Sequence, residues 1–186
     1  MTPHRRRLPH VYPEGAALFL TWHLHGSLPA SLLPPPRSLA SGQAFVWLDR
    51  QLDALRRGPR YLHRPDIAQI VVNSIRKGVE LGHYELGAYV VMPNHVHLLI
   101  QPSIAPECLM KTSQGSQCPR GQPCVRTNRG TVLAKRILRF QKIRMYIEAN
   151  PVKAGLVRSP QDYPWSSAGV ETSLDAARRS ACATLS

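Results

Sequence analysis

The chain has 186 residues, a length that suits one domain with a buried hydrophobic core. Lys and Arg outnumber Asp and Glu by 24 to 11, which gives a formal net charge of +13 at pH 7. Such an excess of positive charge favours a polyanionic partner, and nucleic acid is the first candidate. Because the sequence has neither a long apolar run nor the apolar core of a signal peptide, we expect a soluble, cytoplasmic protein that does not bind membranes.

Strands and helices are predicted in alternation along the first part of the chain. Residues 16–26 are apolar and rich in strand formers, which predicts a strand. The proline-rich stretch 27–42 predicts an extended loop, and apolar residues spaced three and four apart over 45–55 then predict a helix. Asp66 is expected to cap a second helix that ends near Gly82.

Two further strands are predicted at 84–92 and 95–101, where apolar, β-branched runs flank Pro93-Asn94. This spacing is typical of an antiparallel hairpin. The succession of strand, helix, strand and strand predicts an α+β fold, with a ferredoxin-like antiparallel sheet and helices on one face. We expect one domain over 1–170, followed by a C-terminal tail at 171–186.

Residues 132–149 again show apolar side chains at helical spacing, and Asn150-Pro151 is expected to end this helix. Its other face is basic. A solvated helix face is one explanation of that charge, and DNA contact is the other. The residues that we expect to contact DNA are Lys135, Arg136 and Arg139 of this helix and Arg5, Arg6 and Arg7 of an N-terminal arm.

The segment 103–130 interrupts this regular pattern. It has almost no periodic apolar residues, and an irregular segment of this length is uncommon inside a compact domain. Three of the four cysteines lie in it, and none forms a CxxC pair, so neither a zinc ribbon nor a disulfide framework is indicated. We expect free thiols at Cys108, Cys118, Cys124 and Cys182.

His95 and His97 are the most informative residues of the sequence. They lie two apart on a predicted apolar strand, so both imidazoles point to one face while Val96 and Leu98 point to the other. Two imidazoles on one face are a metal-chelating arrangement, although a single histidine on such a strand is more often a core residue. A second pair, His23 and His25, is expected to share a face of its own strand, where it either adds a ligand or lines the same cleft.

Three stretches carry a resemblance to a known family: Met92 to Leu99 (MPNHVHLL), Tyr146 to Val157 (YIEANPVKAGLV) and Asp162 to Ser167 (DYPWSS). Together they resemble the HUH-type single-tyrosine transposases of insertion sequences, and especially the REP-associated tyrosine transposases. HUH denotes two histidines separated by one apolar residue. The resemblance covers roughly residues 8–102 and 140–168.

The resemblance implies that His95 and His97 bind Mg²⁺ or Mn²⁺, which polarises the scissile phosphate of single-stranded or hairpin DNA. A tyrosine on a later helix then attacks and forms a 5′-phosphotyrosine link, as in covalent, metal-assisted catalysis generally. Because Mg²⁺ prefers oxygen ligands, a third side chain, waters and the phosphate are expected to complete the coordination sphere. The family implies either a monomer or a homodimer.

The sequence departs from the family at the nucleophile. The family places the catalytic tyrosine between the HUH strand and the Tyr-Ile-x-x-Asn-Pro-Val helix, yet no tyrosine occurs here between Tyr89 and Tyr146. Tyr146 matches a structural tyrosine of the family, and Tyr163 belongs to its Pro-Trp loop. We therefore assign no catalytic residue and expect 103–139 to be a frame-shifted or deleted catalytic segment, which translation of the two other reading frames would test.

Three functions are compatible with these patterns. The first is a transposase-like protein that binds and cleaves single-stranded or hairpin DNA, and the second is a DNA-binding remnant of such a transposase without cleavage. The third is a metal-dependent phosphodiesterase that uses His95 and His97 with water as the nucleophile.

Overall fold

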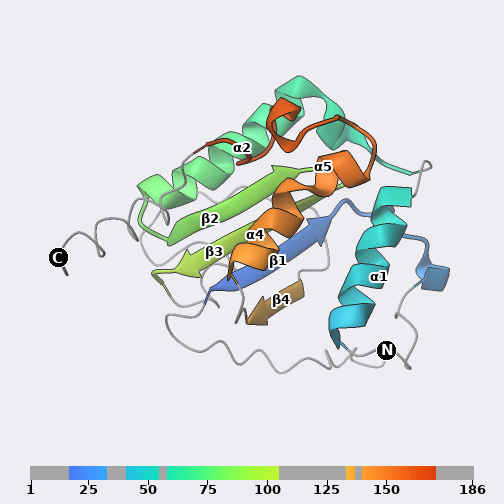
Figure 1. Ribbon diagram of the computed structural model, residues 1–186, viewed down its shortest axis with the longest axis horizontal. Coiled ribbons are helices and arrows are strands. Elements are labelled where there is room, and N and C mark those ends of the chain that lie inside the picture. Colours follow the sequence, from blue (N-terminus) through green and yellow to red (C-terminus); the bar gives the residue numbers. More distant parts are fainter. Residues whose placement is uncertain (1–16, 33–40, 55–57, 105–132, 137–139, 171–186) are drawn as a thin grey trace, which may run out of the picture.

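The computed structural model describes residues 17–32, 41–54, 58–104, 133–136 and 140–170. Its centre is an antiparallel sheet in the order β2-β3-β1-β4 (Figure 1), which is the strand order of a ferredoxin-like sheet. The predicted α+β fold class is confirmed. The strands are β1 (Leu18–His23), β2 (Tyr84–Val91), β3 (His95–Pro102) and β4 (Leu133–Arg136).

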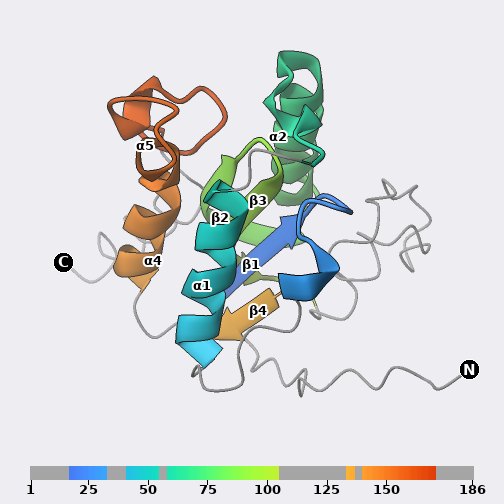
Figure 2. The same cartoon turned by 90° about the vertical axis from the view of Figure 1, so that its right-hand side faces the viewer.

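The helices lie on both faces of the sheet rather than on one, which corrects the expected arrangement (Figure 2). They are α1 (Ser41–Ala54), α2 (Pro65–Glu80), α4 (Phe140–Glu148) and α5 (Asn150–Lys153), with 3₁₀ turns at Ala30–Leu32, Tyr61–His63 and Pro160–Asp162. The described part of the chain has no helix with the length and hydropathy needed to cross a lipid bilayer.

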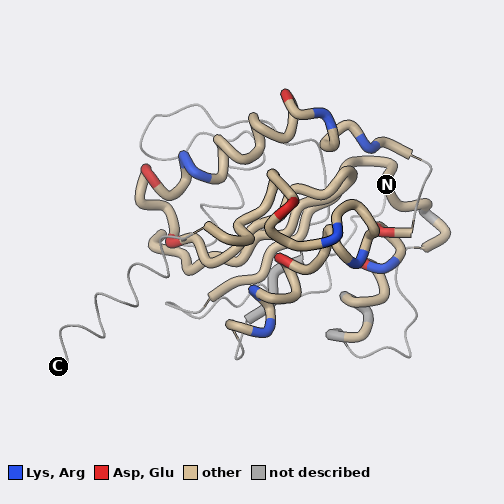
Figure 3. The backbone as a smooth tube through the Cα atoms, turned by 45° about the horizontal axis from the view of Figure 1, so that its top comes forward, with Lys and Arg blue, Asp and Glu red and all other residues tan. Residues whose placement is uncertain are grey.

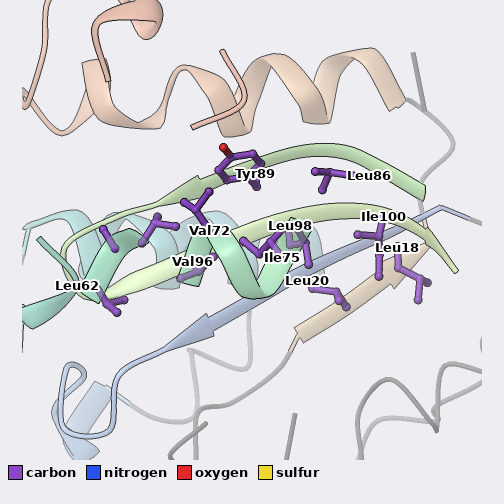
Figure 4. Packing of buried hydrophobic residues seen from close by; sticks show 12 residues of the cluster. Leu18, Leu20, Leu62, Val72, Ile75, Leu86, Tyr89, Val96, Leu98 and Ile100 are labelled. Atoms are coloured by element: carbon purple, nitrogen blue, oxygen red, sulfur yellow. The ribbon is translucent and has the colours of Figure 1, made fainter. Parts of the chain in front are cut away.

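Alternation along the strands divides the core into two layers. On one face, Val72 and Ile75 of α2 pack against the sheet, with Val96 and Leu98 of β3 in the same buried cluster (Figure 4). On the other face, Phe19, Leu99 and the fully buried Ile147 of α4 form a second cluster. Because successive side chains of β3 point to opposite faces, His95 and His97 lie on the α4 side of the sheet.

The start of α2 differs from the sequence prediction. Arg64 precedes the helix, Pro65 occupies its first turn, and Asp66 is a helical residue rather than the cap. Proline suits this position because the first backbone N–H groups of a helix have no intrahelical acceptor. Asp66 instead pairs with Arg64 at 2.8 Å, and both side chains are well exposed, so the pair adds little stability.

The predicted helix from residue 132 is wrong in its first part. Leu133–Arg136 form β4 and pair with β1, and α4 begins only at Phe140. An open edge of β1 offers backbone hydrogen bonds that local helical periodicity cannot outweigh. Lys135 and Arg136 therefore lie on a strand, and the expected basic helix face does not include them.

The outer edge of β2 is covered by the loop at residues 162–167, which contains Pro164 and Trp165 and is called the Pro-Trp loop. The amide of Val91 donates to the carbonyl of Trp165 over 2.8 Å. The amide of Ser167 donates to the carbonyl of Tyr89 over 2.9 Å. The hydroxyl of Ser167 accepts the Tyr89 amide at 3.0 Å and also lies 3.1 Å from Glu148 of α4. This loop satisfies an edge strand that would otherwise expose unpaired backbone groups.

Gly87 allows α4 to approach the sheet. It lies at an irregularity in the β2–β3 register, and a Cβ atom added there would lie 2.5 Å from Cζ of Phe140. Gly87→Ala should therefore lower the free energy of unfolding by about 1–3 kcal/mol, measured by urea denaturation. Adding Phe140→Leu should recover part of that loss. An unchanged stability of Gly87→Ala would contradict this packing.

Candidate metal centre

The two histidines of the HUH sequence lie together where β3 leaves the hairpin turn. Both imidazoles are fully buried on the same face of the strand, and their ring centroids are 4.7 Å apart. The neighbouring strands β1 and β3 carry no Lys, Arg, Asp or Glu (Figure 3), so any charged partner must come from another element.

Asn94 holds the ring of His95. Its side-chain oxygen lies 2.8 Å from Nδ1 of His95, and its amide group donates to the carbonyl of Leu52 in α1 over 2.9 Å. Its backbone carbonyl accepts the amide of Leu24 at 2.8 Å. Because an amide oxygen only accepts, Nδ1 of His95 must carry the proton, which leaves the Nε2 lone pair available to a metal ion.

Thr21 holds the ring of His97 from the neighbouring strand. The two residues are opposite each other in the β1–β3 register, and Oγ1 of Thr21 lies 2.7 Å from Nδ1 of His97. On the other side of the ring, Nε2 lies 2.8 Å from Oδ1 of Asp49. A hydroxyl both donates and accepts, so Thr21 can support His97 with its proton on either nitrogen.

Asp49 supplies a buried carboxylate to the site. It lies on α1, is 2 % exposed, and its Oδ1 is 3.7 Å from Nε2 of His95. The ligand atoms of Asp49, His95 and His97 all lie within 4.8 Å of one another, an arrangement that could hold a metal ion. Its second oxygen, Oδ2, accepts a hydrogen bond from the hydroxyl of Tyr146 on α4.

Sequence reasoning missed Asp49, although one signal was present. Asp49 and Asp53 are the acidic residues of the predicted helix at 45–55, and they follow the apolar Leu48 and Leu52 directly, one turn apart. Both lie beside the apolar face that packs inward, because Leu48 and Leu52 are buried. The sequence does not show that these two aspartates lie near the histidines, because that depends on how α1 crosses the sheet.

The surroundings of His95 and Asp49 lower the pKa values of both groups. Burial and the neighbouring His97 lower the pKa of His95 to about 3, so this ring is neutral at physiological pH. Burial alone would raise the pKa of Asp49, but the attraction and hydrogen bond of His97, with His95 and Tyr146, lower it to about 2. Asp49 is therefore an ionised carboxylate beside two imidazoles.

Two further groups at the site have raised pKa values. Burial and the negative charge of Asp49 raise the pKa of Asp53 to about 7. Burial is the largest cause that raises the pKa of Tyr146 far above its ordinary value. The negative charge of Asp49 and the hydrogen bond to Asp49 raise it further. Lys153 of α5 lies 4.0 Å above the Tyr146 ring and attracts the Asp53 carboxylate, so a cation stands beside Asp53 and Tyr146.

The residues present fit a divalent metal ion. Neutral imidazole nitrogens and a carboxylate oxygen are the donors that Mn²⁺ and related ions accept. Nε2 of His95 is buried and has no hydrogen-bond partner within the described part of the chain, which is the state expected of an unused ligand atom. A pair of rings each held through Nδ1 is also the usual support of metal-binding histidines.

The structure places the second histidine pair differently from the prediction. β1 ends at His23, so His25 lies beyond the strand and is exposed, and the two do not share a strand face. His23 is opposite His95 in the register, but its Nδ1 lies 3.1 Å from Oγ of Ser27. This contact supports a structural role for His23.

The other predicted site residues remain predictions. Arg5, Arg6, Arg7 and Arg139 and the four cysteines lie outside the described residues, as does most of the segment 103–139. Lys135 and Arg136 are placed on β4 by their backbone. Tyr163 does not reach the centre, because its hydroxyl donates to the carbonyl of Val91 over 2.8 Å.

The fold and the site define an α+β protein with a buried Asp-His-His group that fits an HUH motif. Neither the family models nor the curated proteins include a match to this chain. Among solved structures, the chain is similar to one described as the REP-associated tyrosine transposase bound to a REP hairpin. The two chains are 20% identical, the TM-score is 0.47, and the match covers 90% of this chain and 82% of the other.

Proposed function

We propose that this chain is a transposase-like protein that binds single-stranded or hairpin DNA and holds Mg²⁺ or Mn²⁺ at His95 and His97. The observation that carries the proposal is the convergence of both histidines with the buried Asp49. The three sequence stretches of the family and the net charge of +13 support the DNA partner.

The residues of the site would have three roles: binding the ion, orienting the imidazole rings and attracting phosphate. A bound divalent ion would supply Lewis-acid stabilisation of charge on a phosphate of the DNA. His95, His97 and Asp49 would hold that ion, while Asn94 and Thr21 would keep the two rings oriented. The exposed Lys153 and Arg50 lie close enough to the site to interact with its acids and tyrosine, and would attract a phosphate backbone.

A second candidate function is a remnant that binds DNA without cleaving it. It is favoured by the lack of any tyrosine between Tyr89 and Tyr146. Tyr146 does reach the centre, but its hydroxyl is engaged in a hydrogen bond to Asp49. The missing tyrosine and this contact are the observations that favour the second candidate.

One experiment tests both candidates. The full chain is incubated with a labelled single-stranded DNA hairpin and Mn²⁺, and the products are separated on native and denaturing gels. We expect a shifted complex on the native gel, weakened by added salt because phosphate contacts release counterions. A covalent adduct on the denaturing gel would support cleavage through a tyrosine, and release of free product would support hydrolysis by water. If the hairpin is not shifted at all, the proposed DNA partner is wrong.

A further inference from the structure

A second carboxylate faces the histidines from the same helix as Asp49. Asp53 lies one helical turn after Asp49 on α1, and its Oδ1 is 4.0 Å from Nε2 of His95. Oδ1 of Asp49 lies 3.7 Å from the same nitrogen. Nε2 of His95 is therefore close to two carboxylate oxygens that come from one face of α1.

These atoms lie too far apart for a hydrogen bond, yet they are buried. A contact of 4.0 Å exceeds any hydrogen-bond distance. Oδ1 of Asp53 and Nε2 of His95 are both shielded from solvent, and within the described residues neither has a hydrogen-bond partner. Burying two polar atoms without partners is unfavourable, and the closeness of two carboxyl groups adds repulsion when both are ionised.

A cation beside Nε2 of His95 would attract both carboxylates. Two ligand atoms held about 2.1 Å from one ion are separated by about 3.0 to 4.2 Å, depending on whether they are cis or trans. The distances from Nε2 of His95 to the two carboxylates, 3.7 and 4.0 Å, lie in this range. His95 itself is fully buried, so its nitrogen is aimed into the site and not at solvent.

We infer that Asp53 is a fourth protein ligand of the centre. Among the described residues, the ligand atoms that lie within 4.8 Å of one another are those of Asp49, His95 and His97, so Asp53 would join the ion by a change of its side-chain rotamer. The inference rests on the metal centre of the proposed function and adds a ligand to it. Two nitrogen donors beside two oxygen donors suit Mn²⁺ better than Mg²⁺, which prefers an all-oxygen shell. Lys153 also attracts Asp53. The competing explanation of the position of Asp53 is that this lysine is its only partner and that Asp53 binds no metal ion.

The test is Mn²⁺ binding by the full chain without DNA, followed through the electron paramagnetic resonance signal of free Mn²⁺. The unchanged chain should bind one ion. Asp53→Ala should weaken binding by about 10- to 100-fold. Asp66→Ala is the matched control, because Asp66 is an exposed aspartate on α2 that pairs with Arg64, and its loss should leave Mn²⁺ affinity unchanged.

A second measurement covers the case in which Asp53→Ala folds poorly. In the unchanged chain, pulsed resonance in ¹⁷O-labelled water should count about two waters on the bound Mn²⁺, because four protein ligands leave two positions of an octahedral shell. Equal affinity in Asp53→Ala, or about three waters on the Mn²⁺ of the unchanged chain, would overturn the role of Asp53 while leaving the metal centre intact. No Mn²⁺ binding by the unchanged chain would overturn the centre itself.

Discussion

Asp49→Asn is expected to lower the affinity for Mn²⁺ by more than about 100-fold, since even supporting residues of a metal site contribute 10- to 100-fold. The same change should lower the stability of the metal-free protein, because the lowered pKa of Asp49 means that the fold favours its ionised form. Asparagine has the shape of aspartate, still accepts the Tyr146 hydroxyl and can donate to Nε2 of His97. These two contacts should limit the loss of stability.

Thermal unfolding with and without Mn²⁺ measures both parts of this prediction. At an Mn²⁺ concentration of about 100 times Kd, the unchanged chain should gain about 2.7 kcal/mol of stability, whereas Asp49→Asn should gain almost none. Asp66→Asn serves as the control, because it removes an exposed carboxylate of the same type. A strong Mn²⁺-dependent stabilisation of Asp49→Asn would show that Asp49 is not a ligand.

Tyr146→Phe is expected to weaken Mn²⁺ binding by about tenfold or more, because the Tyr146 hydroxyl orients Asp49 through its outer oxygen. The ring would remain packed near Phe19 and His97, so the change removes only the hydroxyl. It leaves a buried carboxylate oxygen without this donor, which should also lower the free energy of unfolding by about 1–3 kcal/mol. We expect Tyr146 to act as a positioning residue and not as the nucleophile.

Tyr163→Phe is the control that separates the effect on Mn²⁺ affinity from the effect on stability. Tyr163 is another partly buried tyrosine, and its hydroxyl donates to the backbone carbonyl of Val91. Its loss should reduce stability without changing Mn²⁺ affinity, measured by titration calorimetry on both variants. Equal Mn²⁺ affinity in Tyr146→Phe and the unchanged chain would remove the positioning role. A DNA adduct that forms with the unchanged chain and disappears in Tyr146→Phe would instead identify Tyr146 as the nucleophile.

The sheet and the histidine face followed from local patterns. The run around Pro93-Asn94 has the alternation and turn residues of a hairpin, and the structure forms that hairpin with the amide of Met92 donating to the carbonyl of His95. The periodicity of two along β3 was enough to place His95 and His97 together. The helix prediction was wrong at Leu133–Arg136. These residues pair with β1, and local helical periodicity does not reveal such a long-range contact.

The sequence by itself determined the α+β class, the shared face of His95 and His97 and the resemblance to HUH transposases, since each depends on neighbouring residues. Only the tertiary structure decided that α1 brings Asp49 and Asp53 to the histidines and that α4 brings Tyr146 to Asp49. Asp49 lies 48 positions before His97, and no local periodicity encodes that separation. It is set by burial of Leu48 and Leu52 and by the bond from Asn94 to α1, which fix how the helix crosses the sheet.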